Sequence, residues 1–228
     1  DAAGLAIAES FRSLVRGTQV AQRNAQDGVN LVQTAEGALS ETTNMLQRMR
    51  ELAVQAANGT MNDNNRAALD GEVQQLLEQI DDIALDTQFN GIFILSATQT
   101  ITLQAGAQVS QTLEIAVAGA TTDDLGVDSL AISTMALAVA AISTIDTALG
   151  SINSLRGKFG AYQNRLEFTI NTLAIQEENM SASESAIRDA DIAKETIAFT
   201  RNQILVSAGT SVLAQANIVP QTALQLLG

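Results

Sequence analysis

The sequence predicts a mainly α-helical protein: a long antiparallel helical bundle or rod with a small β-hairpin element and an extra C-terminal helix. Three observations support this fold class. Only one proline, Pro220, occurs in 228 residues, so little interrupts a helix. Aromatic residues make up 3% of the chain, too few for an ordinary globular core. Long segments place apolar residues at alternating steps of three and four, the spacing of helices that pack side by side.

The first predicted helix covers residues 1–58. Its heptad positions are Ala35, Ala38, Thr42, Met45, Met49, Leu52 and Ala56, and Leu39, Leu46 and Ala53 widen them into a stripe. The glycines at positions 4, 17, 28 and 37 are interpreted as points of close helix–helix contact. A helix of this length cannot bury its stripe alone, so a partner helix is expected.

The stretch "NGTMNDNN" predicts a stop and a restart. Gly59 suits the left-handed position after a helix end, and Asn62 or Asp63 can cap a second helix that runs to about Thr87. Its buried face comprises Leu69, Val73, Leu76, Leu77, Ile80 and either Ile83 or Ala84. This helix is expected to fold back antiparallel to the first.

The next segment has β character. Asn90-Gly91 indicates a turn, followed by a short β-rich run at residues 92–95. The alternating stretches "TITLQAG" and "QTLEIAVAG" predict a β-hairpin. Residues 118–133 are predicted to be a polar connector that contains Asp123 and Asp124.

A third long helix is predicted from Ser133 or Thr134 to residue 182. Its apolar seam is Ile145, Leu149, Ile152, Phe159, Leu166, Ile170 and Leu173, and the polar seam positions Arg156, Gln163 and Glu177 are expected to fix the register. "SASE", residues 181–184, matches a capping box and predicts a new helix over 186–228. That last helix carries Ile197, Ile204, Ala208, Val212 and Leu213.

Composition excludes several classes of function. The net charge of −13 argues against binding to nucleic acid or to an anionic membrane surface, and no apolar run is judged long enough to span a membrane. Without histidine or cysteine, ordinary zinc sites, thiolate nucleophiles and Ser-His-Asp triads are impossible. The adjacent acids Asp81-Asp82 and Glu177-Glu178 diverge by about 100° on a helix and are interpreted as solvated. No enzymatic activity, cofactor or metal is therefore expected.

One charged stretch interrupts the apolar pattern of the first helix. "LQRMRELAVQAANGT", residues 46–60, contains Arg48, Arg50 and Glu51. Arg48 and Leu52 are four residues apart and are expected to share a face, with Glu51 beside them. Spacing alone favours a solvated face with local ion pairs.

Six separated stretches resemble bacterial flagellin, and the resemblance extends over almost the whole chain. In chain order they are "ETTNMLQRMRELAVQAANGT", "TQFNG", "DDLGVDSL", "NRLEFTINTL", "IRDADIAKET" and "AGTSVLAQANIVPQ". The resemblance implies a hairpin-shaped subunit, secreted and polymerised in many copies into the hollow, extracellular flagellar filament. It implies that residues 1–117 and 134–182 belong to the outer-tube domain and residues 186–228 to the inner tube.

The chain departs from the family in two respects. Flagellins normally carry a further N-terminal helix that pairs with the C-terminal one, so this chain is expected not to form normal filaments by itself. Many also insert large variable domains where only the connector, residues 118–133, stands here.

The resemblance also implies partners. It indicates that Gln47, Arg48, Glu51, Leu52 and Glu72 pack between subunits and, on the free monomer, contact Toll-like receptor 5. It assigns Ile197, Ile204, Val212 and Leu213 to polymerisation and to binding of the flagellar export chaperone. The filament cap and hook-junction proteins are further expected partners, whereas nucleic acid and membrane are not.

Two other functions remain open from the sequence. One is a flagellin-like hook–filament junction protein, and the other is a trimmed receptor agonist. "TQFNG" and "LAQANIVPQ" favour flagellin over the junction protein.

Overall fold

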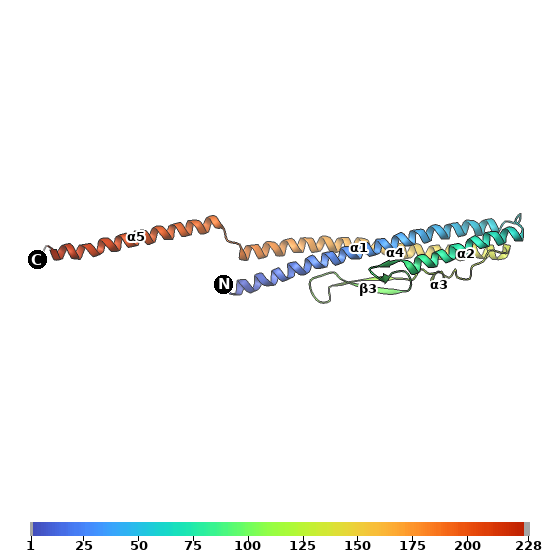
Figure 1. Cartoon of the computed structure of the whole chain (residues 1–228), viewed down its shortest axis with the longest axis horizontal. Helices are drawn as coiled ribbons and strands as arrows, with labels where there is room; N and C mark the ends of the chain where they lie inside the picture. Colours follow the sequence, from blue (N-terminus) through green and yellow to red (C-terminus); the bar gives the residue numbers. More distant parts are fainter. Residues whose placement is uncertain (1, 226–228) are drawn as a thin grey trace. The chain divides into compact units, whose positions relative to one another are not determined.

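The computed structural model describes residues 2–225, with side chains described through residue 217 (Figure 1). The elements, in chain order, are α1 (Ala2–Ala56), α2 (Asp63–Asp86), β1 (Gln88–Phe89), β2 (Ile92–Phe93), β3 (Gln99–Gln104), β4 (Thr112–Val117), α3 (Thr122–Leu125), α4 (Met135–Arg188) and α5 (Ile192–Gln225). The mainly helical fold class is confirmed. The chain divides into two compact units, one of residues 10–181 and one that joins the start of α1, up to Glu9, to the chain from residue 182 onward.

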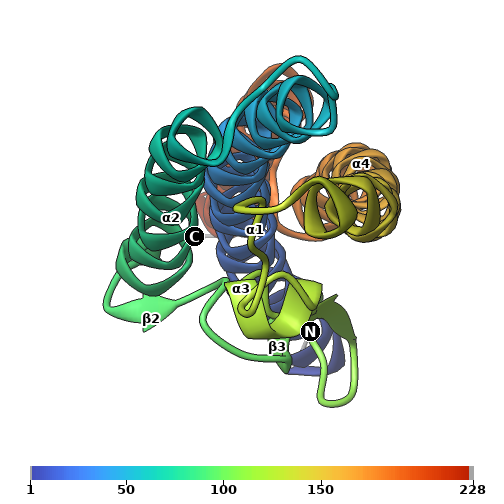
Figure 2. The same cartoon turned by 90° about the vertical axis from the view of Figure 1, so that its right-hand side faces the viewer.

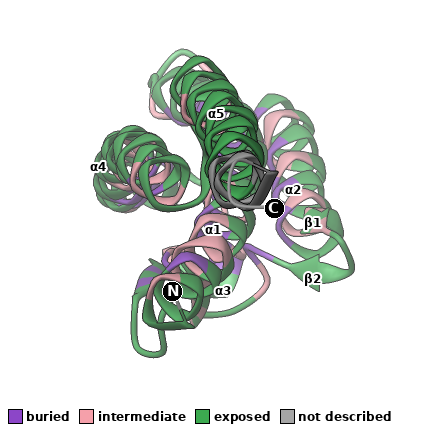
Figure 3. Cartoon of the chain, turned by 90° about the vertical axis from the view of Figure 1, so that its left-hand side faces the viewer, coloured by how far each residue is buried: buried purple, intermediate pink, exposed green. Residues whose placement is uncertain are grey.

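Within residues 10–181, α1 is antiparallel to both other long helices. Arg48 on α1 contacts Glu72 on α2, whereas Ala56, later on α1, contacts the earlier Arg66 of α2. The same reversal relates α1 to α4. Gln19 donates to Glu177 at 2.7 Å, and Arg50 donates to Asp146 at 2.6 Å. Consequently α2 and α4 run parallel to each other, and Figures 2 and 3 show them on opposite sides of α1.

Apolar seams form the core of this unit, as heptad spacing predicts. On α4 the residues at successive intervals of seven are all buried: Ile145, Ile152, Phe159, Leu166 and Leu173. The first four of them, Ile145 to Leu166, pack with buried α1 residues such as Leu39 and Leu46 and with Val73 and Ile80 of α2 in one continuous cluster. The many alanines of α1, buried at positions 35, 53 and 56 among others, leave room for neighbouring backbones to approach.

The turn between α1 and α2 is built around a buried arginine. Arg66, 7% exposed, donates from Nε to the Ala56 carbonyl at 2.9 Å and from Nη2 to the Asn58 carbonyl at 3.1 Å. Its Nη1 pairs with Asp63 at 3.1 Å. The carbonyls at a helix C-terminus have no partner within the helix, and a guanidinium is suited to satisfy them. Asn62 caps α2 by accepting from the Asn65 amide at 2.8 Å, which confirms one of the two predicted caps.

Arg66→Ala is expected to lower the free energy of unfolding by about 1–3 kcal/mol, because the α1 carbonyls would lose their buried donors. Urea denaturation followed by circular dichroism measures this change. Arg50→Ala, at an exposed arginine of the preceding helix, serves as the control. An Arg66 variant with the parent's denaturation midpoint would contradict this role.

The β elements confirm the predicted turn and the predicted β-hairpin, and they add a short β1–β2 pair. Asn90 and Gly91 have φ values of 50° and 80° and form the turn between β1 and β2. In the larger hairpin, Leu103 of β3 lies opposite Leu113 of β4. This hairpin packs against α1 at a glycine: a Cβ on Gly28 would stand 2.3 Å from Leu103 Cδ1. The interpretation of Gly28 as a point of helix–helix contact holds, since Leu166 of α4 also lies 3.3 Å from that Cβ position, but the hairpin approaches this glycine most closely.

The connector is more ordered than predicted. It contains the short helix α3, capped by Thr121 and ended by Gly126 at φ 67°. The Asp81 carboxylate of α2 accepts from the Thr122 amide and hydroxyl, both at 2.8 Å. The interpretation of Asp81 as a solvated acid is wrong, because it anchors α3 to α2.

The boundary between the last two helices also differs from the prediction. α4 continues through the "SASE" stretch to Arg188, and α5 begins at Ile192. The cap of α5 is Asp191, whose Oδ1 accepts from the amides of Ala193 at 3.0 Å and Lys194 at 3.2 Å. Ser and Glu can both occupy positions inside a helix, so the capping-box pattern does not mark the start of a new helix here.

One helical stretch among the described residues, within 135–217, is long and apolar enough to cross a membrane by length and composition alone. The prediction that no run reaches that length is therefore wrong. The property does not by itself indicate a membrane protein, because helices that pack in a protein core share it.

Candidate protein interfaces

A network of exposed charges joins α1 to α2. Arg48 donates from Nε to Glu72 at 2.9 Å and from Nη1 to Glu51 at 3.1 Å. The side chains of Arg48, Glu51 and Glu72 are 50%, 70% and 45% exposed, and Gln47 is exposed beside them. The hydrogen bonds to Glu72 and Glu51 raise the pKa of the Arg48 guanidinium, so this group remains charged. These four residues form one surface, here called the Arg48 surface.

Leu52 does not belong to this surface. Its exposed fraction is 1%, and it packs in the core with Met49 and Ala56. The expectation that Leu52 shares an exposed face with Arg48 is wrong. Four residues turn a helix by about 40° beyond a full turn, enough to carry Leu52 onto the heptad stripe that α1 buries.

Two further arginines of the bundle contact acids across helices. Arg50 pairs with Asp146 of α4 at 2.6 Å, and this hydrogen bond raises the pKa of Arg50. Arg156, a polar member of the α4 seam, pairs with Glu36 of α1 at 2.9 Å, with about one third of each side chain exposed. The partners of both arginines lie about a hundred residues away in the sequence, so helical spacing does not predict these pairs.

The apolar side chains of α5 are exposed. Ile197, Ile204, Val212 and Leu213, the residues predicted for polymerisation and chaperone binding, have exposed fractions of 70%, 62%, 66% and 65%. Figure 3 shows the described part of α5 exposed almost throughout. A helix with exposed apolar groups of this size is stabilised by burial against another surface.

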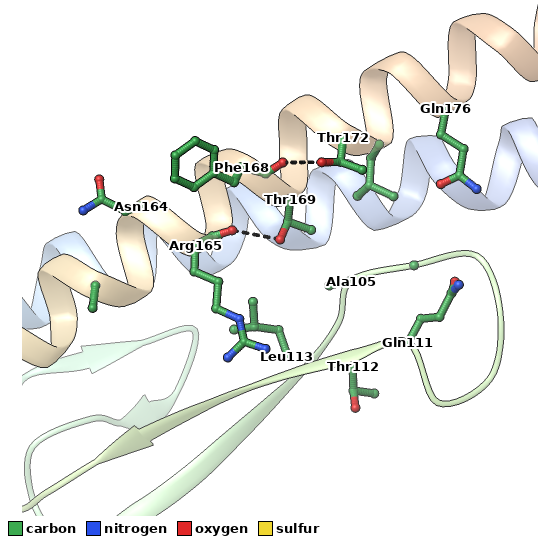
Figure 4. A pocket seen from close by; sticks show the side chains of 13 residues that line it. Ala105, Gln111, Thr112, Leu113, Asn164, Arg165, Phe168, Thr169, Thr172 and Gln176 are labelled. Atoms are coloured by element: carbon green, nitrogen blue, oxygen red, sulfur yellow. Dashed lines mark hydrogen bonds between the residues drawn. The ribbon is translucent and has the colours of Figure 1, made fainter.

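An open groove lies between α4 and the tip of the β3–β4 hairpin (Figure 4). Its volume is about 750 Å³, and Arg165, Phe168 and Thr172 of α4 line one side. Ala105, Gln111 and Leu113 of the hairpin line the other. Among the described residues, no group of three acids is close enough to hold a metal ion.

Comparison with known proteins accounts for this architecture. Residues 1–100 match the bacterial flagellin N-terminal helical region, and residues 142–227 match the bacterial flagellin C-terminal helical region. A flagellin of Halalkalibacterium halodurans is 47% identical over 233 residues, and the match covers 100% of this chain and 85% of the relative. A flagellar filament 31.3 kDa core protein of Treponema maltophilum is 42% identical over 245 residues, with the same coverage.

A solved structure shares the fold. The crystal structure of Bacillus cereus flagellin superposes with a TM-score of 0.58 at 36% identity, covering 71% of this chain and 94% of that one. The family and the relatives are structural flagellins and not enzymes, which agrees with the prediction that the chain is not an enzyme. The sequence, its helical fold and the matches at both ends show that the chain belongs to the bacterial flagellin family.

Proposed function

We propose that this chain is a structural subunit of the bacterial flagellar filament, which self-assembles outside the cell by helix–helix packing. The observation that carries the proposal is the exposed apolar surface of α5, on a chain whose relatives are flagellins and filament core proteins. Burial of apolar area contributes about 25 cal/mol per Å², so repeated contacts between copies stabilise a polymer.

The helices have separate places in this proposal. Residues 1–117 and 134–182 form the outer-tube part of the subunit, and residues 186–228, which contain α5, form the inner tube. The connector, residues 118–133, replaces a variable domain. Its hydrogen bonds to α2, from the Ile132 amide to Asp70 and from Thr122 to Asp81, make it a short bridge on the bundle surface.

Electron microscopy of filaments isolated from the source organism tests this function, with mass spectrometry to identify the chain. We expect antibody label along the whole filament. Label confined to the filament base would instead support a hook–filament junction protein. Absence from filaments, together with receptor binding, would support the trimmed receptor agonist.

The Arg48 surface supports a second role, recognition of the monomer by Toll-like receptor 5. Its charged groups are accessible, and the planar guanidinium of Arg48 is held in place by two carboxylates. An arginine fork can make several hydrogen bonds to a partner without losing its charge. Packing against other subunits would cover the same surface, so recognition is proposed for the free monomer.

Arg48→Ala and Glu72→Ala are each expected to weaken receptor binding by about tenfold or more, because an interfacial charged hydrogen bond would be lost. Titration of soluble monomer with the receptor ectodomain measures the affinity. Arg50→Ala is a matched control, since Arg50 lies on the same helix with a similar exposed fraction, 46%, but faces α4.

Circular dichroism is the control for folding, and each of these variants is expected to remain helical. If the parent binds the receptor and both variants bind equally well, the Arg48 surface is not the contact. Weaker binding by the Arg50 control would show that the effect is not specific to this surface.

A further inference from the structure

A second stripe runs along the exposed side of α4. Its members follow the three-and-four spacing of a helix-packing seam: Lys158, Ala161, Arg165, Phe168, Thr172 and Ile175. All six are exposed, and the exposed fractions of Phe168 and Ile175 are 72% and 62%. The buried seam of the same helix is a separate set of positions, so α4 carries two seams and the bundle uses one. We call the exposed set the outer α4 stripe.

Four of the six residues of the outer α4 stripe, Ala161, Arg165, Phe168 and Thr172, line the groove described above. Figure 4 shows Arg165, Phe168 and Thr172 on α4 above the hairpin. A groove with a helical wall and a protruding aromatic ring is suited to receive another helix.

The charges of the stripe indicate what kind of helix it receives. Lys158 and Arg165 are seven residues apart, about 10.5 Å along the helix axis. Among the described residues neither forms an ion pair, although the chain has 25 acidic and only 12 basic residues. Two unpaired cations on so acidic a chain favour an acidic partner surface.

Such a surface exists on α2 of the chain itself. Glu78, Asp82 and Asp86 are exposed at successive intervals of four, and none forms an ion pair within the described part of the chain. Like charges four residues apart on a helix repel each other, and an opposing cation removes that penalty. Leu85, 51% exposed, adds apolar area beside them. We call this set the acidic α2 face.

The geometry of the bundle allows these two surfaces to meet only between copies. They lie on helices at opposite sides of α1 (Figures 2 and 3), and the contacts of both helices with α1 show that the two helices run parallel. A neighbouring copy with the same orientation therefore presents its α2 to this copy's α4 in parallel. Glu78 and Asp86 are eight residues apart, about 12 Å, which approximates the spacing of Lys158 and Arg165.

We propose that the outer α4 stripe of one copy binds the acidic α2 face of a second copy, with Lys158 near Glu78 and Arg165 near Asp86. This register places Phe168 just beyond the end of α2, where Ile92 and Phe93 of β2 are exposed by 42% and 49%. The contact joins two different surfaces, so in a bound pair one copy keeps its acidic α2 face free and the other keeps its outer α4 stripe free. Contacts of this heterologous kind continue into rings or open helical polymers.

The inference rests on the proposed filament function, and charge reversal tests it. Expressed in the source organism in place of the parent, Lys158→Glu combined with Arg165→Glu is expected to abolish the filaments that the parent forms there. Adding Glu78→Lys and Asp86→Lys to the same chain is expected to restore polymer, because the charges then match again. Undiminished polymer from the first variant, or no recovery in the fourfold variant while circular dichroism stays helical, would overturn the interface.

Cross-linking tests the register independently, since the chain has no cysteine of its own. A copy with Ala161→Cys is mixed with a copy carrying Asp82→Cys and treated with a mild oxidant. Because a disulfide requires Cα atoms within about 7 Å, this pair is expected to cross-link much faster than Ala161→Cys mixed with Gln55→Cys. Equal rates for the two pairs would contradict the register.

The cross-linking samples also distinguish the proposed interface from the proposed filament function. Filaments without the 161–82 cross-link would refute the interface and leave the filament function standing. The cross-link without filaments would support the interface and count against the filament function. Absence of both would refute both.

Discussion

Replacing Ile204 and Leu213 by glutamate is expected to abolish polymerisation while the bundle of residues 10–181 remains folded. Both side chains are more than 60% exposed in the chain and belong to the surface proposed to be buried between copies. Burial of such a side chain contributes about 1.5–3 kcal/mol, so losing two raises the protein concentration needed for polymer by about a hundredfold or more. Negative-stain microscopy and sedimentation of filaments from the source organism, with the variant expressed in place of the parent, measure the effect.

A control for added charge is Ala97→Glu with Thr100→Glu, two exposed positions in and beside the hairpin. Long tubular polymers formed by the α5 variant would refute the role of α5. The same helix is the proposed binding segment for the export chaperone. Deleting residues 190–228 is therefore expected to eliminate chaperone binding, and unchanged chaperone affinity after the deletion would contradict that assignment.

Leu52→Ala is expected to lower the free energy of unfolding by about 2–5 kcal/mol, because it removes a core side chain and leaves a cavity. Leu52 is 1% exposed and packs in the cluster that joins α1 to its neighbours. Val54→Ala is the matched control, since Val54 lies two residues away and its exposed fraction is 49%. The control is expected to change stability by no more than about 0.5 kcal/mol. Urea denaturation followed by circular dichroism compares the two.

This variant also separates packing from recognition. Under conditions in which Leu52→Ala remains folded, its affinity for the receptor is expected to equal that of the parent, in contrast to Arg48→Ala. A variant with unchanged stability and weakened receptor binding would place Leu52 on the contact surface after all.

The elements that sequence predicts well are those specified by local chemistry. Asn62 was one of two predicted caps and does cap α2, because the cap depends on residues within one turn. The Asn90-Gly91 turn forms because these residue types tolerate positive φ. The buried series on α4, Ile145 to Leu173, follows from a repeat of seven that keeps one face toward the bundle.

Most errors occur where distant residues override local signals. The capping-box pattern at residues 181–184 is an exception, because it is a local pattern that also fits a helix interior: α4 continues to Arg188, and Asp191 caps α5. The short α3 depends on Asp81, which lies 41 residues earlier in the chain. Gly28 accommodates a strand side chain whose approach no helical spacing indicates.

The candidate surfaces also divide into those that the sequence predicts and those that it misses. Sequence reasoning selected Arg48, Glu51 and Glu72 through a family resemblance, and the structure places them together at hydrogen-bond distance. The same resemblance, together with a spacing of four residues from Arg48, also selected Leu52, which the structure buries. Sequence reasoning missed the outer α4 stripe, since its apolar and basic positions are interleaved with the buried seam of the same helix.

The sequence by itself determined the family, the helical class, the cap of α2 and the buried seam of α4, since each depends on residue types within a few turns of one another. Only the tertiary structure decided that Leu52 is buried, that the outer α4 stripe is left exposed, and that Arg156 meets Glu36 and Arg50 meets Asp146. A helix with two possible seams buries the one that gains most contact with its neighbours. That gain depends on side chains about a hundred residues away, which local spacing does not specify.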